Sequence, residues 1–360
     1  MKRWLFASAL IVLPAFSQPA SLIINPGTPD GAALQAIASE NDEAKKVALE
    51  EDFVAKYPKS EGAGWVGSLL AAAYVQQKAY DKALEAADKV YSGNPGDLDL
   101  GFNAVKAAEG KGDVETVKKW ATHTEEVAKK ITAKAPANDD DKQLADHAKE
   151  VASYAEYSLY GMALRSKDTK QIVDLGETLL QLNAKSPYMW LISDRYLAAL
   201  GPKGCSTAAK LSADDSKNAE AWLFQADCSW RGQAAAAVIG DANKALEALN
   251  TRAKVDGGNE ATKIGLANFF VGTGNALQQR WGPADKALRV ALPSVKSGTY
   301  GGYALFYLGL ANYSLGKAIG DRAKEREALG FFEQSAGMKS AVQDQAARNV
   351  ATIKAELGVK

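Results

Sequence analysis

Apolar residues in this chain recur at three- and four-residue spacing, within segments rich in alanine, leucine, lysine and glutamate. Val47, Phe53, Val54 and Tyr57, for example, form one apolar face before Pro58. Such spacing predicts amphipathic helices, and the glycine, proline and asparagine residues between the segments predict turns. No segment from residue 18 onward shows the alternation of apolar and polar residues that predicts a strand. The breaks divide the chain into about sixteen helices, which pair as about eight antiparallel hairpins.

A short motif of aromatic, small and apolar residues returns at a period of roughly 34 residues, which is typical of stacked helical hairpins. The clearest copy holds Leu70, Ala71, Tyr74, Tyr80, Ala83 and Pro95. A middle copy holds Trp281, Ala284, Leu288 and Ala291, and a C-terminal copy holds Leu308, Gly309, Ala328, Phe332 and Ala336. The small residues let two helices approach closely, while a large ring from the next helix fills the remaining space.

These copies resemble the tetratricopeptide repeat. The resemblance implies an all-α protein, a right-handed α-solenoid of antiparallel helical hairpins over residues 31–360, with a soft break near residues 135–142. In that family the first helices of the hairpins line a concave groove. Residues 53–60 (FVAKYPKS) are also similar to joints in periplasmic tetratricopeptide proteins that assist outer-membrane assembly, so the resemblance is to the exported bacterial type. The helix expected at residues 341–357 would cap the array through a polar outer face.

The N-terminus has the organisation of a secretory signal peptide: a basic start, an apolar run at residues 4–16, and small residues after it. The apolar run is shorter than the ~18 residues that span a bilayer. We expect a signal peptide at residues 1–17, with cleavage after Ser17 or alternatively after Ala20. An extended segment is expected at residues 18–30. The mature chain is therefore expected to be exported, periplasmic or secreted, and to lack a transmembrane segment.

If the chain is exported, its two cysteines enter an oxidising compartment, where they can form a disulfide. Cys205 lies early in one expected helix, residues 203–211, and Cys228 lies late in the next, residues 219–231. Antiparallel packing of these helices would bring both sulfur atoms to a similar height. We expect a disulfide between Cys205 and Cys228, and the alternative is a pair of buried thiols.

Charge and motifs argue against several other classes of function. The chain has 43 basic and 43 acidic side chains, without the basic excess that nucleic-acid-binding proteins use to neutralise phosphates. Residues 62–67 (GAGWVG) fit the letters of a dinucleotide fingerprint, but a helix rather than a strand precedes them. His123 and His147 are expected on the surface, without ligands at metal spacing. No serine stands in a nucleophile elbow. We therefore expect no enzyme, no cofactor, no metal site and no nucleic-acid partner.

Aromatic and arginine side chains on the first helices are the candidates for partner binding, because such residues contribute most to protein interfaces. If the groove of the family carries over, it would be lined by Trp65, Tyr188, Arg195, Trp230, Arg231, Tyr303, Phe306 and Tyr313. The alternative for each ring is packing between neighbouring helices. Five rings of one segment cannot all pack into the contact between the same two helices. These rings are Tyr300, Tyr303, Phe306, Tyr307 and Tyr313.

The sequence thus predicts a non-catalytic scaffold or adaptor of the periplasm or cell envelope. It would bind a protein or peptide partner through a concave helical-repeat surface. One alternative is a carrier that holds a small ligand, a glycan or a lipid, in an aromatic-lined pocket near Tyr303. Another is a hydrolase on a helical scaffold, which would need a histidine or carboxylate pair brought together by folding. No motif names the partner, the pathway or the oligomeric state.

Overall fold

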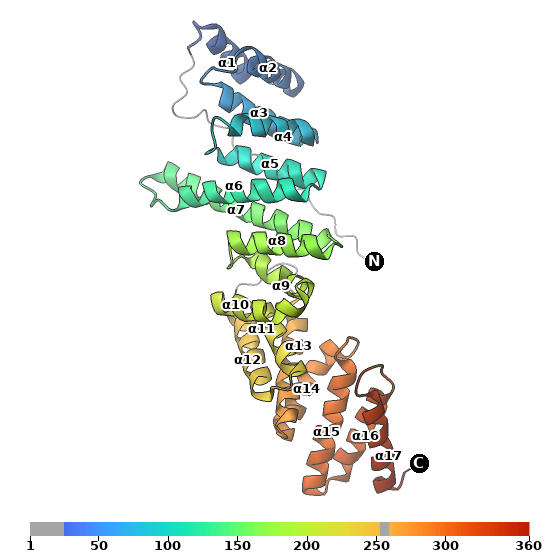
Figure 1. Ribbon diagram of the computed structural model, residues 1–360. Helices are drawn as coiled ribbons and strands as arrows, with labels where there is room; N and C mark the ends of the chain where they lie inside the picture. The colour runs from blue at the N-terminus through green and yellow to red at the C-terminus, as the bar shows by residue number, and fades with distance from the viewer. Residues whose placement is uncertain (1–24, 253–258, 360) are drawn as a thin grey trace. The chain divides into compact units, whose positions relative to one another are not determined.

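The computed structural model describes residues 25–252 and 259–359 of the 360-residue chain. Within these residues there are seventeen α-helices, one short 3-10 helix and no strand (Figure 1). The chain forms two compact units, Met1–Ser158 and Leu159–Lys360, and the boundary falls inside α7 (Asp139–Arg165). None of the described helices is both long enough and apolar enough to cross a membrane.

The first unit is a stack of consecutive helices. It contains α1 (Pro29–Ser39), α2 (Glu43–Lys56), α3 (Ala63–Gln76), α4 (Tyr80–Tyr91), α5 (Leu98–Lys111), α6 (Val114–Thr132) and most of α7. α1 begins just before the end of the segment expected to be extended, residues 18–30. The expected signal peptide, residues 1–17, and both candidate cleavage sites lie outside the described residues. The soft break expected near residues 135–142 corresponds to the turn between α6 and α7, and it stays a prediction.

The second unit continues the same construction. It contains α8 (Thr169–Leu182), α9 (Pro187–Ala199), α10 (Gly204–Asp214), α11 (Ala219–Arg231), α12 (Ala235–Thr251), α13 (Glu260–Leu277), α14 (Trp281–Val295), α15 (Gly301–Ile319), α16 (Arg322–Ala336) and α17 (Gln343–Leu357). The 3-10 helix, Gly201–Lys203, precedes α10. Each of these helices packs on the next. The all-α helical-repeat fold is therefore confirmed. The number of helices exceeds the expected sixteen or so because α17 follows the last hairpin as a single helix.

Local chemistry explains where the helices begin and end. The Asp97 carboxylate accepts a hydrogen bond of 2.9 Å from the Leu100 backbone N–H at the start of α5. At the other end of the chain, Asp321 accepts one of 2.9 Å from the Ala323 N–H at the start of α16. Such caps satisfy donors that have no partner within the helix. Gly320, at φ 69°, ends α15 in the left-handed region, so a glycine and an aspartate make the tight link between the two helices.

Small residues set how closely paired helices approach. A Cβ atom on Gly309 would lie 2.8 Å from the ring of Phe332, which is buried against α15. A Cβ atom on Gly176 would lie 2.4 Å from the ring of Tyr196. At both places a ring of the neighbouring helix occupies the space that a side chain would need. Gly309 and Phe332 both belong to the repeated motif, so their contact is the close packing that the motif predicts.

A disulfide joins α10 to α11. It links Cys205 to Cys228 across a sequence separation of 23 residues, with their Cα atoms 6.1 Å apart. Gln225 strengthens the same pair of helices by donating a hydrogen bond to the hydroxyl of Ser212. The bridge therefore closes the hairpin that precedes the charged junction described below.

Glu50 is a buried carboxyl group in α2. Its side chain is 2 % exposed, and its Oε2 atom has no hydrogen-bond partner. Burial raises the pKa of Glu50 from 4.5 to about 7, and the nearby Lys46 only partly offsets this effect. The folded state therefore binds a proton more tightly than the unfolded state does. Between these two pH values the stability of the first unit falls as the pH rises.

Replacing Glu50 by glutamine should stabilise the first unit at alkaline pH. Glutamine keeps the shape of the protonated side chain and removes the ionisation, so the gain at pH 8 should be about 1–3 kcal/mol. At pH 4 both forms are neutral in the folded state, and the two proteins should be nearly equal. Amide hydrogen exchange of residues 43–56 in the full chain measures the difference. An equal response to pH in both proteins would contradict this explanation.

Replacing both Cys205 and Cys228 by serine should lower the free energy of unfolding of the second unit. Loss of a bridge that closes a loop of this length removes about 3 kcal/mol through the entropy of the unfolded chain. Calorimetry of the oxidised protein, the same protein under dithiothreitol, and the double variant measures the effect. The reductant should reproduce the variant and should leave the variant itself unchanged. If dithiothreitol left the stability of the parent protein unchanged, this would show that the disulfide does not form.

Candidate functional site

The odd-numbered helices of the second unit form an inner row. Besides packing on its sequence neighbours, α9 contacts α11, α11 contacts α13, and α13 contacts α15 (Figure 1). Among the described helices of this unit, no comparable contact joins α10, α12, α14 and α16 to one another. Helices that approach more closely than their partners lie on the concave side of a curved stack. We call α9, α11, α13 and α15 the inner row and α10, α12, α14 and α16 the outer row.

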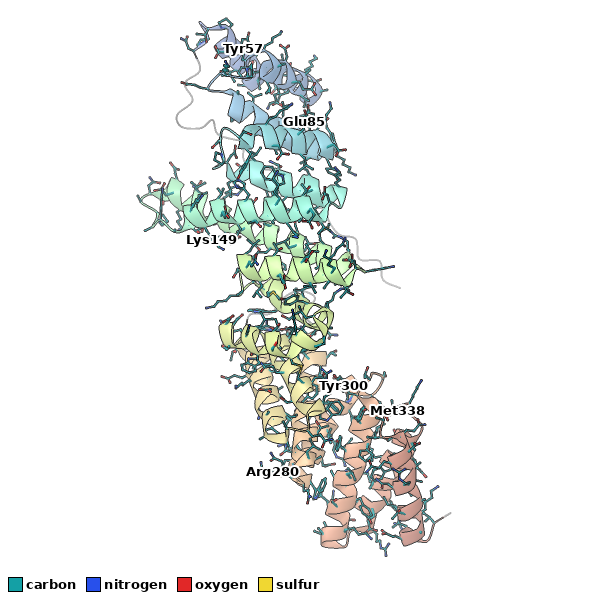
Figure 2. All side chains as sticks on the ribbon, viewed as in Figure 1. Tyr57, Glu85, Lys149, Arg280, Tyr300 and Met338 are labelled. Atoms are coloured by element: carbon teal, nitrogen blue, oxygen red, sulfur yellow. A yellow bond between two sulfur atoms is a disulfide. The ribbon has the colours of Figure 1, made fainter. Side chains whose placement is uncertain are left out.

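Aromatic rings from three inner helices meet in one cluster, which we call the ring cluster: Trp230, Phe269, Phe270, Tyr300 and Tyr303. The Trp230 ring lies 4.9 Å from that of Tyr303, 5.8 Å from that of Tyr300 and 5.6 Å from that of Phe269, with edge-to-face geometry in each pair. Phe269 and Phe270 are fully buried, whereas Trp230, Tyr300 and Tyr303 are only partly buried. Figure 2 shows Tyr300 at the N-terminal end of α15. The cluster therefore has a packed base on α13 and a solvent-accessible edge on α11 and α15.

Polar groups border the ring cluster. The hydroxyl of Tyr300 donates a 2.9 Å hydrogen bond to the carboxylate of Asp227, which also pairs with Arg231 at 2.5 Å. Burial, and then the charge of Asp227, raise the pKa of the Tyr300 hydroxyl. Tyr303 and Tyr307 continue along one face of α15. No hydrogen bond joins the Tyr303 hydroxyl to any described residue, so this group is available to a partner.

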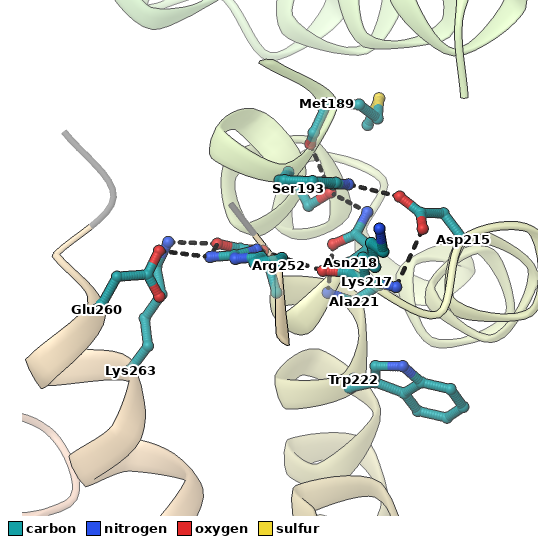
Figure 3. Close-up of polar contacts among 12 residues, drawn as sticks. Met189, Ser193, Asp215, Lys217, Asn218, Ala221, Trp222, Arg252, Glu260 and Lys263 are labelled. Carbon is teal, nitrogen blue, oxygen red and sulfur yellow. Dashed lines mark hydrogen bonds and ion pairs between the residues drawn. The ribbon is translucent and has the colours of Figure 1, made fainter. Parts of the chain in front are cut away.

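A buried network of charges fixes the junction of α11, α12 and α13 (Figure 3). The guanidinium group of Arg252 makes two hydrogen bonds to the Glu220 carboxylate, at 2.6 and 2.8 Å, and one to Glu260 at 2.9 Å. Lys263 donates to Glu220 as well. The side chains of Arg252 and Glu220 are each 1 % exposed. Partners on both sides keep the pKa of Glu220 below its usual value in spite of burial.

The same junction extends to α9 through neutral and charge-assisted hydrogen bonds. The indole N–H of Trp190 donates to Asp215 at 2.6 Å, and the Asn218 amide donates to the Ser193 hydroxyl at 3.1 Å. The guanidinium of Arg252 also lies 5.1 Å from the centre of the Trp190 ring, a cation–π contact. Hydrogen bonds and ion pairs thereby join α9 to the residues that link α11, α12 and α13.

Three of the residues expected in the groove are brought together by the fold. Trp230 and Tyr303 belong to the ring cluster, and Arg231 borders it through Asp227. Tyr188 also lies on the inner row, at the start of α9, where its ring stacks on that of Tyr160 at 5.7 Å.

The other expected groove residues have different roles. Phe306 is a correction: its side chain is 3 % exposed and packs on Phe332, because its position on α15 faces α16 rather than solvent. Tyr313 donates to the carboxylate of Glu356 and so ties α15 to α17. Arg195 donates to the backbone carbonyl of Ser166. Trp65 belongs to the first unit and packs against the apolar cluster of α1, α2 and α3.

The sequence did not identify several important residues of this unit: Glu220, Asp227, Arg252, Lys263, Phe269 and Phe270. They are spread over separate helices and have no common spacing. The Phe269–Phe270 pair was the one available signal, since two adjacent rings on a helix face different neighbours.

The two histidines are more constrained than expected. His123 is half-buried, its ring lies 4.3 Å from that of Tyr91, and burial lowers its pKa. It borders a cavity of about 520 Å³ in the first unit, between the turn before α5 and helices α6 and α7. Its Nε2 atom is buried without a hydrogen-bond partner, and no carboxylate of the described residues hydrogen-bonds to the ring. His147 makes a 2.8 Å hydrogen bond to Asp99, which raises the pKa of His147. The expectation of a solvated histidine is therefore wrong for His123, whereas the side chain of His147 is 37% exposed and paired with Asp99.

Within the described residues, no group of three or more histidine, cysteine, aspartate or glutamate side chains is placed to hold a metal ion. His147 and Asp99 link α7 to α5, and both are more than a third exposed. His123 lines its cavity together with Glu126, Lys130 and Asp141.

Comparison with known proteins gives no family. No family model matches the chain, and no curated protein matches it. Among solved structures, the chain is similar to one titled "Crystal structure of APC/C hetero-tetramer Cut9-Hcn1", with 12% identity and a TM-score of 0.32 over 92% of this chain. It spans 57% of that chain. It is also similar to yeast Tom70, with 12% identity and a TM-score of 0.23, covering 92% of this chain and 97% of that one.

Replacing Arg252 by methionine should strongly destabilise the second unit. The change leaves the buried Glu220 and the partly buried Glu260 without their common partner, and breaking a buried pair in this way costs about 3–5 kcal/mol. Urea unfolding followed by circular dichroism measures the loss. The matched control is Arg326→Met on the exposed face of α16, which should change stability by less than about 0.5 kcal/mol. Equal effects at the two arginines would contradict the role given to the network.

Proposed function

We propose that the protein is a non-catalytic scaffold that binds a protein or peptide partner on the inner row of its second unit. The observation that carries this proposal is the ring cluster: partly exposed Trp230, Tyr300 and Tyr303 on a buried base of Phe269 and Phe270. Aromatic rings that are already packed lose little conformational freedom when a partner covers them, and for that reason they make strong contributions to interfaces.

The polar border suits an extended peptide or a helix laid across the inner row. The free hydroxyl of Tyr303 and the Asp227–Arg231 pair offer hydrogen bonds and charges beside the apolar rings. An apolar centre with a polar rim is the usual composition of a protein interface. The charged junction holds α9, α11 and α13 in place before binding, which reduces the entropy that association costs.

The cell compartment is part of the same proposal. We propose that the chain is exported and acts in the periplasm or outside the cell. The pattern of the N-terminus supports export, and the disulfide between Cys205 and Cys228 is compatible with an oxidising compartment. The alternative function, a carrier of a glycan or lipid near Tyr303, is separated from this one by the experiment below.

The experiment is a selection of peptides on the immobilised full chain from a displayed library of random dodecapeptides. Binding of the selected peptides is then measured by fluorescence anisotropy. The variant Tyr303→Ala should weaken their binding at least tenfold, because it removes a ring at the exposed edge of the cluster. Circular dichroism checks that the variant keeps its helix content.

The matched control is Phe331→Ala, which removes a partly buried ring from α16 in the outer row. It should change binding less than twofold. Equal losses at Tyr303 and Phe331 would contradict the assignment of the inner row. Failure to select any peptide, together with binding of a glycan or lipid that Tyr303→Ala abolishes, would favour the carrier instead.

A further inference from the structure

The cavity beside His123 in the first unit has no part in the proposed function. Its volume of about 520 Å³ lies within the range of roughly 300–1,000 Å³ that is typical of small-molecule sites. The end of α4, the turn before α5, α6 and the start of α7 all contribute to its lining. Every residue of the lining belongs to the first unit, so the cavity is a property of that unit alone.

Apolar side chains form much of the lining. The larger ones are Tyr91, Pro95, Val127, Ile131, Pro136 and Leu144. Leu144 is 48 % exposed although it is a large aliphatic residue. A ligand in the cavity would cover this side chain, and removing apolar surface from water favours binding.

One polar atom of the lining residues lacks a partner. His123 lines the cavity, and its Nε2 atom is buried without a hydrogen bond to any described residue. A polar atom buried in this way destabilises the folded state, and a hydrogen bond to a ligand removes that penalty.

The walls of the cavity are fixed by contacts within the protein. The imidazole ring of His123 packs edge-to-face on Tyr91, with ring centroids 4.3 Å apart, and on Trp120, at 5.7 Å. In the turn before α7, Asp141 accepts a 3.0 Å hydrogen bond from the backbone N–H of Ala137. Groups that are already held in place lose little freedom when a ligand binds, and this favours binding.

The charges of the lining indicate an uncharged ligand. Lys130 and Lys134 contribute two positive charges. Glu126 and Asp141 contribute two negative charges, so the sum is zero. Burial lowers the pKa of His123, so its ring is neutral at pH 7. One nitrogen of a neutral imidazole donates and the other accepts, and a hydroxyl group suits either one because it can do both.

We propose that this cavity binds a small uncharged molecule with an apolar ring system and one hydroxyl group, of the chemical class of phenols and naphthols. The hydroxyl forms a hydrogen bond with Nε2 of His123, and the rings lie against Ile131 and Leu144. The site is separate from the ring cluster of the second unit, so its failure would leave the proposed function unaffected.

The test measures binding of 2-naphthol to the full chain by equilibrium dialysis at pH 7. The comparison compound is 2-methylnaphthalene, in which a methyl group replaces the hydroxyl. The parent protein should bind 2-naphthol at least fivefold more tightly, because only the hydroxyl can hydrogen-bond to His123. In His123→Phe, which keeps a ring for packing on Tyr91 and Trp120, the two affinities should differ less than twofold.

A second pair of variants locates the site. Leu144→Glu places a charge at the cavity and should weaken binding of 2-naphthol at least tenfold. The matched control is Leu164→Glu, because Leu164 lies on the same helix, is 50 % exposed and is not part of the lining. This control should change binding less than twofold. Circular dichroism confirms that each variant folds.

The histidine rings give a direct readout, because the chain has only two histidines. The nitrogen resonances of the His123 ring should shift when 2-naphthol is added to the parent protein. Those of His147, which is not part of the lining, should stay in place. The variant His147→Gln assigns the two sets of resonances.

Three results would overturn the proposal. The first is absence of 2-naphthol binding by the parent protein, or binding that Leu144→Glu leaves unchanged. The second is equal affinity of the parent for both compounds without a shift of the His123 resonances, since the cavity would then be apolar only. The third is loss of binding in Tyr303→Ala, which would place the naphthol on the ring cluster of the second unit.

Discussion

Burial of each helix face against the next helix is the interaction on which the rest of this structure depends. No single helix here can cover its own apolar side, and consecutive helices provide the cover for one another. Glycine at points of closest approach, as at Gly309 against Phe332 and Gly176 against Tyr196, sets the spacing of the helices. The surface that a partner would meet is a consequence of this spacing, because it decides which helices stand next to each other on the concave side.

The charged junction adds precision to this packing. Apolar faces tolerate small slips of one helix along another, whereas a guanidinium group bonded to two carboxylates does not. Glu220 lies at the start of α11, Arg252 follows the end of α12 and Glu260 begins α13, so their geometry specifies how these helices meet. Trp190 and Asp215 extend the constraint toward α9. The ring cluster is therefore carried by helices whose relative positions are fixed by directional bonds.

The two units use titratable groups differently. In the first unit, Glu50 is buried and His123 is half-buried, and burial favours the neutral form of each. In the second unit the buried charges of Glu220 and Arg252 are paired with each other. The binding surface is placed on the second unit because the ring cluster lies there.

The sequence by itself determined the helices and the repeated pairing, because periodicity, aspartate caps and glycine breaks act over a few neighbouring residues. It also identified Trp230, Arg231 and Tyr303 as candidates, since their residue types carry interface energy wherever they are exposed. Only the tertiary structure decided which ring faces solvent: Phe306 and Tyr303 lie one helical turn apart, yet one packs on Phe332 and the other joins Trp230. It alone brought Glu220, Arg252 and Lys263 together. These residues are far apart along the chain, and their meeting depends on the angle and register of the stacked helices, which no local pattern records.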